Sequence, residues 1–166
     1  KKMVDEHVLI KRWLALIPKV IENIDLGIEE DLELIKNSMD FIRNYADKYH
    51  HAKEEDEAFK YFDENLDIIK VIRKDHIKVR THVMKMFEAI EAKDKKKLAY
   101  HLNAYKEILP EHIKKEDEIL YPWMDRNLTM TQIGELFSKF NEIDVKYGNA
   151  PKKHYKFIEE LEKKYK

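Results

Sequence analysis

Apolar residues recur every three or four positions along four long stretches of the chain, and this periodicity constrains the fold more than any other feature. The stretches cover, approximately, residues 4–24, 28–62, 69–90 and 98–119. Such spacing places the apolar side chains on one face of an α-helix. The third stretch is the most regular, with a nearly heptad series from Ile69 to Ile90 in which His76 takes an apolar position.

Short polar turns near Gly27, Asn65 and Lys93 separate these stretches. Short connections make consecutive helices antiparallel neighbours. The chain has only three Gly and four Pro, which favours long helices over a sheet. The sequence therefore predicts an all-α fold: an up-down-up-down four-helix bundle over residues 1–125, followed by one or two additional C-terminal helices over residues 126–166.

The C-terminal stretch has helix start and stop signals of its own. Thr129 and Gln132 have the spacing of a capping box, which predicts a helix from there to about Tyr147. The sequence Gly148-Asn-Ala-Pro151 ends that helix, and we expect the last helix to pack on the outside of the bundle.

Composition narrows the classes of function. The chain has 32 Lys and Arg against 33 Asp and Glu, so its charge gives no reason to expect nucleic acid or an anionic membrane as a partner. It has no Cys, so a bound metal would need His and carboxylate ligands. No apolar run of about 18 residues and no signal-peptide pattern is present, and the expected protein is soluble and cytoplasmic.

Two helical stretches carry a histidine and a glutamate four residues apart. His112 precedes Glu116, and His50 precedes Glu54. This spacing places an imidazole and a carboxylate on one face of a helix, about one turn apart. Imidazole nitrogen and carboxylate oxygen together suit Fe, Mn or Zn, and helical bundles hold such metals between facing helices.

Each of the four predicted helices contributes one histidine from its apolar face to the same layer. Residues counted from the turns place His7, His50, His76 and His112 at nearly equal heights in an antiparallel bundle. Glu54 and Glu116 then lie at a common height as well. At about 100° per residue, His50 and Glu54 point inward, whereas His51 points away from that direction.

A single histidine on an apolar face is more often an ordinary core residue than a ligand. Four in one layer with two carboxylates are hard to explain in that way, because unsatisfied buried polar groups cost a few kcal/mol each. We expect the remaining histidines, His82, His101 and His154, to lie on the surface or just behind the ligands. Tyr121 and Trp123 are expected to pack in the core or cap it.

The chain resembles the hemerythrin-like, or HHE cation-binding, proteins over roughly residues 3–125. The motifs that carry this resemblance are Glu6-His7, His50-His51-x-x-Glu54-Glu55, Asp75-His76-x-x-x-Arg80 and His112-x-Lys-x-Glu116-Asp-Glu-Ile-Leu-Tyr-Pro122. The resemblance implies two non-haem irons (Fe) joined by an oxo or hydroxo bridge and two carboxylates. The implied terminal ligands are His7, His50, His76 and His112, with Glu54 and Glu116 as bridges.

The chain departs from the oxygen-carrying members of that family in two places. Arg80 stands four residues after His76, where those proteins have a fifth histidine, and the final His–Glu pair is spaced one residue closer than their His–Asp pair. The fifth position is therefore open to His51, His82, a tyrosine or water. Arg80 is expected to orient a carboxylate or a bound anion.

Three functions are compatible with this pattern. The first is a di-iron protein that binds or reacts with a small diatomic or peroxide ligand (O2, NO or peroxide). The second is a sensor of iron, oxygen or NO, or an iron-centre repair protein, without catalytic turnover and with its output at residues 126–166. The third, a purely structural bundle, predicts that no metal copurifies. The sequence leaves open whether the protein is an enzyme.

Overall fold

The computed structural model describes residues 2–165, which are almost entirely helical and include no strand. This confirms the predicted all-α class. The elements in chain order are α1 (Lys2–Asn23), α2 (Glu29–Asp40), the π-helical segments η1 (Phe41–His51) and η2 (Lys53–Ala58), the short 3-10 segment η3 (Phe59–Tyr61), α3 (Asp67–Glu91), α4 (Lys95–Lys115), the π-helical turn η4 (Glu116–Leu120), α5 (Tyr121–Asn127), α6 (Met130–Tyr147) and α7 (Ala150–Lys164).

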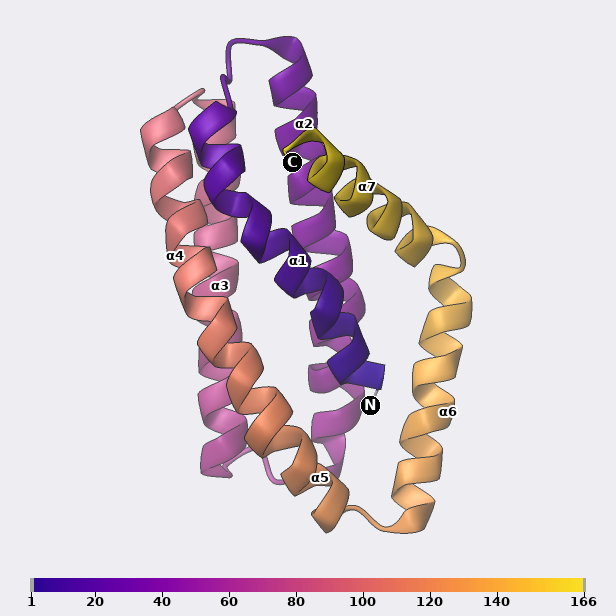
Figure 1. The fold of residues 1–166 in the computed structure, drawn as a ribbon. Coiled ribbons are helices and arrows are strands. Elements are labelled where there is room, and N and C mark those ends of the chain that lie inside the picture. Colours follow the sequence, from indigo (N-terminus) through magenta and orange to yellow (C-terminus); the bar gives the residue numbers. More distant parts are fainter. Residues whose placement is uncertain (1, 166) are drawn as a thin grey trace.

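The long helices of the first three quarters of the chain lie lengthwise beside one another (Figure 1). Helix α3 packs most extensively on α4, and α1 also contacts α4. Segment η1 continues directly from α2 and touches both α1 and α3. This arrangement lets side chains from α1, η1, α3 and α4 converge on one interior.

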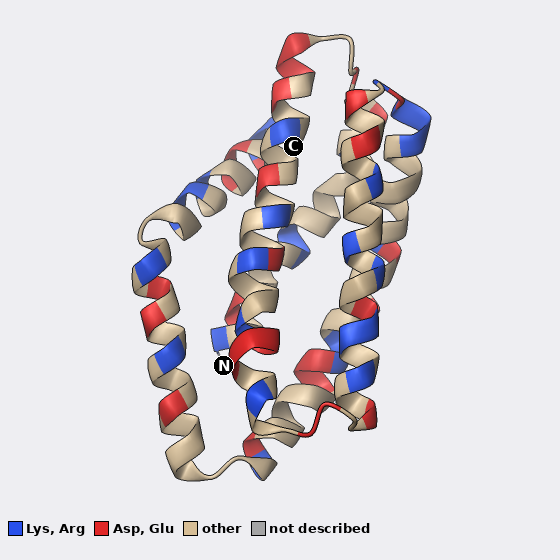
Figure 2. Cartoon of the chain, turned by 180° about the vertical axis from the view of Figure 1, so that it is seen from behind, with Lys and Arg blue, Asp and Glu red and all other residues tan. Residues whose placement is uncertain are grey.

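The outward faces of these helices carry charges of both signs. Lys and Arg alternate with Asp and Glu along the ribbon without a large region of one sign (Figure 2). Within residues 2–165, no helix combines the length and apolar character that a membrane crossing requires.

Two apolar clusters fill the interior, one on each side of a polar layer. The larger includes Leu9, Trp13 and Tyr105, and the smaller includes Ile69 and Leu120. Along each of the four converging helices, buried histidine or glutamate residues lie between the residues of the two clusters. The clusters therefore exclude bulk water from the polar layer above and below it.

The helix that follows α2 is π-helical where it meets this layer. Segments η1 and η2 surround His50, His51 and Glu54. A π-helix forms i→i+5 hydrogen bonds, so each turn holds more residues than an α-helical turn, and such turns are frequent at functional sites. The expectation that His51 points away from the interior is wrong, because its side chain is buried and only 4% exposed. That expectation assumed the geometry of an α-helix, whereas the segment is π-helical.

The C-terminal helices begin and end as their sequence signals indicate. The Thr129 hydroxyl accepts from the Gln132 N–H, and the Gln132 side chain accepts from the Thr129 N–H, which confirms the capping box. Gly148 ends α6 with φ +54°, a conformation that L side chains rarely adopt. Helix α6 contacts η2, and α7 contacts α1 and η1.

His154 on α7 is a buried core residue, contrary to the expectation of a surface position or one behind the ligands. Its ring lies 5.9 Å from the ring of Phe41 and 5.7 Å from that of Tyr45, centroid to centroid. Burial is the main cause that lowers the pKa of His154; the nearby charge of Lys153 acts in the same direction and that of Asp40 opposes it.

We predict that His154 makes α7 packing sensitive to acid. Below about pH 6.5 the unfolded chain takes up a proton at this imidazole, whereas the folded protein resists it, so stability falls with pH until the lowered folded pKa is reached. Thermal unfolding of the wild type and His154→Gln should therefore be compared between pH 8 and pH 5. The wild type should lose more stability than the variant, and parallel curves would contradict the prediction.

Candidate metal centre

The buried layer contains two groups of metal-ligating atoms that share one residue. Each group consists of residues whose ligand atoms all lie within 4.8 Å of one another, and all of these residues are buried. The first is His7, His50, Glu54 and Glu116, and the second is His51, His76, His112 and Glu116. The structure thus brings together the six site residues expected from sequence and adds His51.

Both glutamates contact histidines of both groups. Glu54 places Oε1 3.3 Å from Nε2 of His50 and Oε2 3.2 Å from Nε2 of His76. Glu116 Oε1 is in close contact with Nε2 of His112 and lies 3.9 Å from Nε2 of His7. The two carboxylates therefore occupy the boundary between the groups: Glu54 turns one oxygen towards each group, whereas Glu116 turns Oε1 towards both.

Several potential ligand atoms inside the layer have no hydrogen-bond partner. His50 Nε2, Glu54 Oε2 and Glu116 Oε1 are buried and make no hydrogen bond. Nε2 of His76 lies 3.1 Å from Nε2 of His112, and a proton on either one can serve only one such contact. Buried polar atoms without partners are costly, so this donor set fits bound cations.

A carboxylate supports the outer ring nitrogen, Nδ1, of each of the four histidines expected from sequence. The pairs are His7 with Asp117 (2.7 Å), His50 with Glu6 (3.0 Å), His76 with Glu55 (2.6 Å) and His112 with Asp75 (3.1 Å). When Nδ1–H donates to a carboxylate, the Nε2 lone pair is left free for a metal, and the ring becomes a stronger ligand. All four rings are held in this way.

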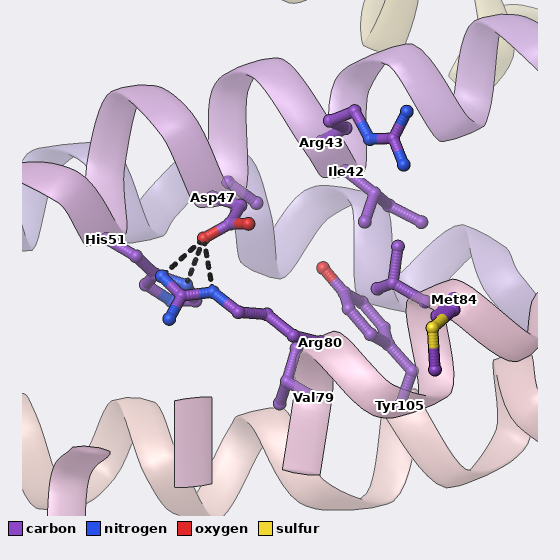
Figure 3. A pocket seen from close by; sticks show the side chains of 10 residues that line it. Ile42, Arg43, Asp47, His51, Val79, Arg80, Met84 and Tyr105 are labelled. Atoms are coloured by element: carbon purple, nitrogen blue, oxygen red, sulfur yellow. Dashed lines mark hydrogen bonds and ion pairs between the residues drawn. The ribbon is translucent and has the colours of Figure 1, made fainter. Parts of the chain in front are cut away.

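Arg80 orients the carboxylates behind the second group. Its guanidinium contacts Asp47 Oδ1 at 2.9 and 2.7 Å, and it reaches both oxygens of Glu55 at 3.1 and 3.2 Å. Asp47 in turn lies 3.7 Å from Nδ1 of His51 (Figure 3), whose ring stacks on His76 with 4.0 Å between centroids. Arg80 thus orients carboxylates, one of the two roles expected of it.

The pKa values of the histidines diverge across the layer. Burial lowers the pKa of His7 and, together with the charge of His76, lowers that of His112 to about 4. Burial acts in the same direction at His50, but the adjacent carboxylates of Glu54 and Glu6 raise its pKa to about 9. The layer therefore favours a positive charge at His50 and disfavours one at His7 and His112.

The two central carboxylates also have different proton affinities. Burial and the charge of Glu54 raise the pKa of Glu116 well above its usual range. Burial acts to raise the pKa of Glu54 too, but the neighbouring side chains of Glu116, His50 and His76 lower it well below that range. A single proton shared by this pair reduces their repulsion, which a metal cation would do more effectively.

A sequence model of the hemerythrin HHE cation-binding domain matches residues 1–127. The chain belongs to the hemerythrin HHE cation-binding family. The matched hemerythrin domain contains both ligand groups and their supporting carboxylates, and it ends with α5. Helices α6 and α7 lie outside it. No curated protein and no solved structure gave a significant match to the chain.

Tyr121 belongs to the hemerythrin site, although the sequence suggested only packing. Its hydroxyl lies 2.5 Å from Glu54 Oε1, 2.8 Å from Glu116 Oε2 and 3.5 Å from His7 Nε2. The single phenolic hydrogen can be donated to only one carboxylate at a time. Trp123 packs against Phe62 as expected, with 4.6 Å between ring centroids.

His82 and His101 are not among the candidate ligands, as the sequence indicated. They face each other, half-buried, with 2.9 Å between their Nδ1 atoms.

The supporting carboxylates Glu6 and Asp75 each precede a ligand histidine in the sequence. Each supports the histidine of a different helix, and this pairing becomes visible only once the helices are placed.

A cavity of about 280 Å³ opens beside the second ligand group. Its walls are mainly apolar, with Ile42, Val79 and Val83 among them, and Asp47, His51 and Arg80 at its polar part (Figure 3).

We predict that Asp75→Asn weakens metal binding on the His112 side by about 10- to 100-fold, because the amide supports the imidazole less strongly than a carboxylate. Competition with a chelator during a metal titration of the purified protein measures this change. Asp67→Asn, on the exposed start of the same helix, is the control and should retain wild-type affinity. Equal affinities for all three proteins would refute the role assigned to Asp75.

Proposed function

We propose that the protein holds two non-haem irons and binds or reacts with a small diatomic or peroxide ligand. The observation that carries this proposal is the pair of buried ligand groups that share Glu116, with Glu54 facing a histidine of each. Membership of a cation-binding family supports iron as the metal. In this proposal the four helices form an up-down-up-down bundle around the centre.

The proposed ligand assignment is asymmetric. His51, His76 and His112 would hold one iron, His7 and His50 would hold the other, and Glu54 and Glu116 would supply oxygen ligands to both. His51 is thus our choice among the candidates for the fifth position, because its ring is buried against His76 within the second group. The iron beside His7 and His50 would have one nitrogen ligand fewer, which would leave room for a small exogenous ligand.

The protein residues around that open position would control what binds there. Bound ferrous iron would supply electrons or a coordination position for O2, NO or peroxide. The Tyr121 hydroxyl lies nearest to the His7 side and can donate a hydrogen bond to a ligand or to either bridge. The apolar clusters on both sides of the layer limit the entry of water.

The first test is anaerobic reconstitution with Fe(II), followed by admission of O2. We expect about two irons per chain and, after oxidation, the near-ultraviolet charge-transfer absorption of a bridged diferric centre. Glu116→Ala removes a residue common to both groups and should abolish this signal, whereas Glu118→Gln, an exposed neighbour two residues on, should keep it. An iron content well below two in the wild type would exclude the proposal.

A second test addresses Tyr121. Tyr121→Phe should retain two irons but bind azide or NO about 5-fold more weakly, because it removes one hydrogen bond of about 1 kcal/mol beside the open position. Spectroscopic titration measures this affinity. Tyr100→Phe, at a position 66% exposed, is the matched control. Unchanged affinity in Tyr121→Phe would show that the hydroxyl does not contact the exogenous ligand.

One observation favours a second candidate function, a sensor without turnover. The buried side chains of Glu6 and Lys53 connect the site to α6. Helix α6 lies within residues 126–166, where the sensor hypothesis places the output. Negligible consumption of O2 or peroxide by the reconstituted protein, together with a ligand-dependent change in residues 126–166, would favour the sensor over the reactive centre.

A further inference from the structure

Lys53 is a fully buried cation that lies between the metal layer and the C-terminal helices. Its Nζ donates to Glu6 Oε2 at 2.5 Å and to Asp144 Oδ1 on α6 at 2.9 Å. It also lies 3.9 Å from the centre of the Tyr49 ring, and the Tyr49 hydroxyl donates to Asp144 at 2.6 Å. A buried ammonium is tolerated only when it is paired in this way.

The other carboxylates that support ligand histidines are paired with exposed cations. The side chains of Lys11, Lys115 and Arg80, which pair with Asp117, Asp75 and Glu55, are 57%, 42% and 39% exposed, respectively, whereas that of Lys53 is 0% exposed. An exposed ion pair contributes little to stability. Among these four carboxylates, Glu6, which supports His50, is the one paired with a buried cation. That cation, Lys53, also contacts α6, which lies outside the matched domain.

A continuous series of hydrogen bonds therefore joins α6 to a ligand ring. Asp144 contacts Lys53, Lys53 contacts Glu6, and Glu6 Oε1 contacts His50 Nδ1 at 3.0 Å. Three of these side chains, His50, Lys53 and Glu6, are buried. The ends of the series come from segments almost a hundred residues apart in sequence.

We propose that the docking of α6 and the binding of metal at His50 stabilise each other through Asp144, Lys53 and Glu6. This inference rests on the proposed function. Asp144 shares the positive charge of Lys53, which leaves Glu6 free to act as a strong acceptor for the His50 N–H. Without the Asp144 charge, Lys53 withdraws more electron density from Glu6, and His50 becomes a weaker ligand.

The coupling is reciprocal, because two linked equilibria must influence each other by the same free energy. A cation bound at His50 strengthens the His50–Glu6 hydrogen bond and fixes Glu6. When Glu6 is fixed, it holds the Lys53 ammonium in position to donate to Asp144. Metal binding therefore reduces the local opening of α6 around that residue.

The first experiment compares Fe(II) affinity, measured anaerobically against a chelator, in the wild type and Asp144→Asn. The variant should still bind two irons, one of them about 10-fold more weakly. Glu135→Gln is the matched control: it neutralises the α6 carboxylate that accepts from the Tyr61 hydroxyl (3.0 Å), a contact that has no connection to His50. The control should retain wild-type affinity for both irons.

The second experiment measures backbone hydrogen exchange in α6, at residues 141–147, with and without Fe(II). In the wild type and in Glu135→Gln, exchange should slow by several-fold when iron binds. In Asp144→Asn this protection should largely disappear. The measurement reports on coupling directly and does not depend on whether the protein reacts with O2.

Four results would overturn the proposal, and they point to different causes. Wild-type iron affinity in Asp144→Asn, or identical α6 exchange with and without iron, excludes the coupling and leaves the iron centre intact. Equal weakening by Asp144→Asn and Glu135→Gln would indicate a general loss of α6 packing rather than this series of side chains. Absence of iron from the wild type removes the proposed function and the coupling together.

Discussion

The structure depends on the neutralisation of a buried layer of carboxylates and imidazoles. Glu54 and Glu116 lie close together with essentially no exposure to water, inside a core that is apolar on both sides. Effective penalties for burying ionised groups reach several kcal/mol each unless opposite charges and hydrogen bonds compensate. A layer of this kind is a weak point in a purely structural bundle, and it becomes a source of stability when cations bind.

The supporting carboxylates also tie the helices to one another. Glu6 of α1 supports a histidine of η1, Asp75 of α3 supports one of α4, and Asp117 of η4 supports one of α1. The rings of His7, His50, His76 and His112 are therefore each oriented by a segment other than their own. The shape of the site and the packing of the helices cannot change independently, because a shift of one helix would move both a ligand and the support of another.

The helices and the convergence of the six expected site residues could be predicted because both follow from periodicity. Apolar spacing gave the helical segments, and counting from short turns placed four histidines in one layer, where the structure brings them together. The position of His51 could not be obtained in that way, since angles were computed for an α-helix and the segment is π-helical. Tyr121 and the buried Lys53 were missed because their contacts depend on how α5 and α6 pack, which periodicity does not specify.

The π-helical segments Phe41–His51 and Lys53–Ala58 make the placement of the ligand residues in this helix depend on the number of residues that it contains. Its wide turns let the adjacent residues His50 and His51 serve different ligand groups. Removing one residue would rotate everything beyond the deletion by up to about 100° relative to the neighbouring helices. Side chains lining the core can be exchanged and repacked, but an insertion or deletion here would change which side chains of this helix face each ligand group.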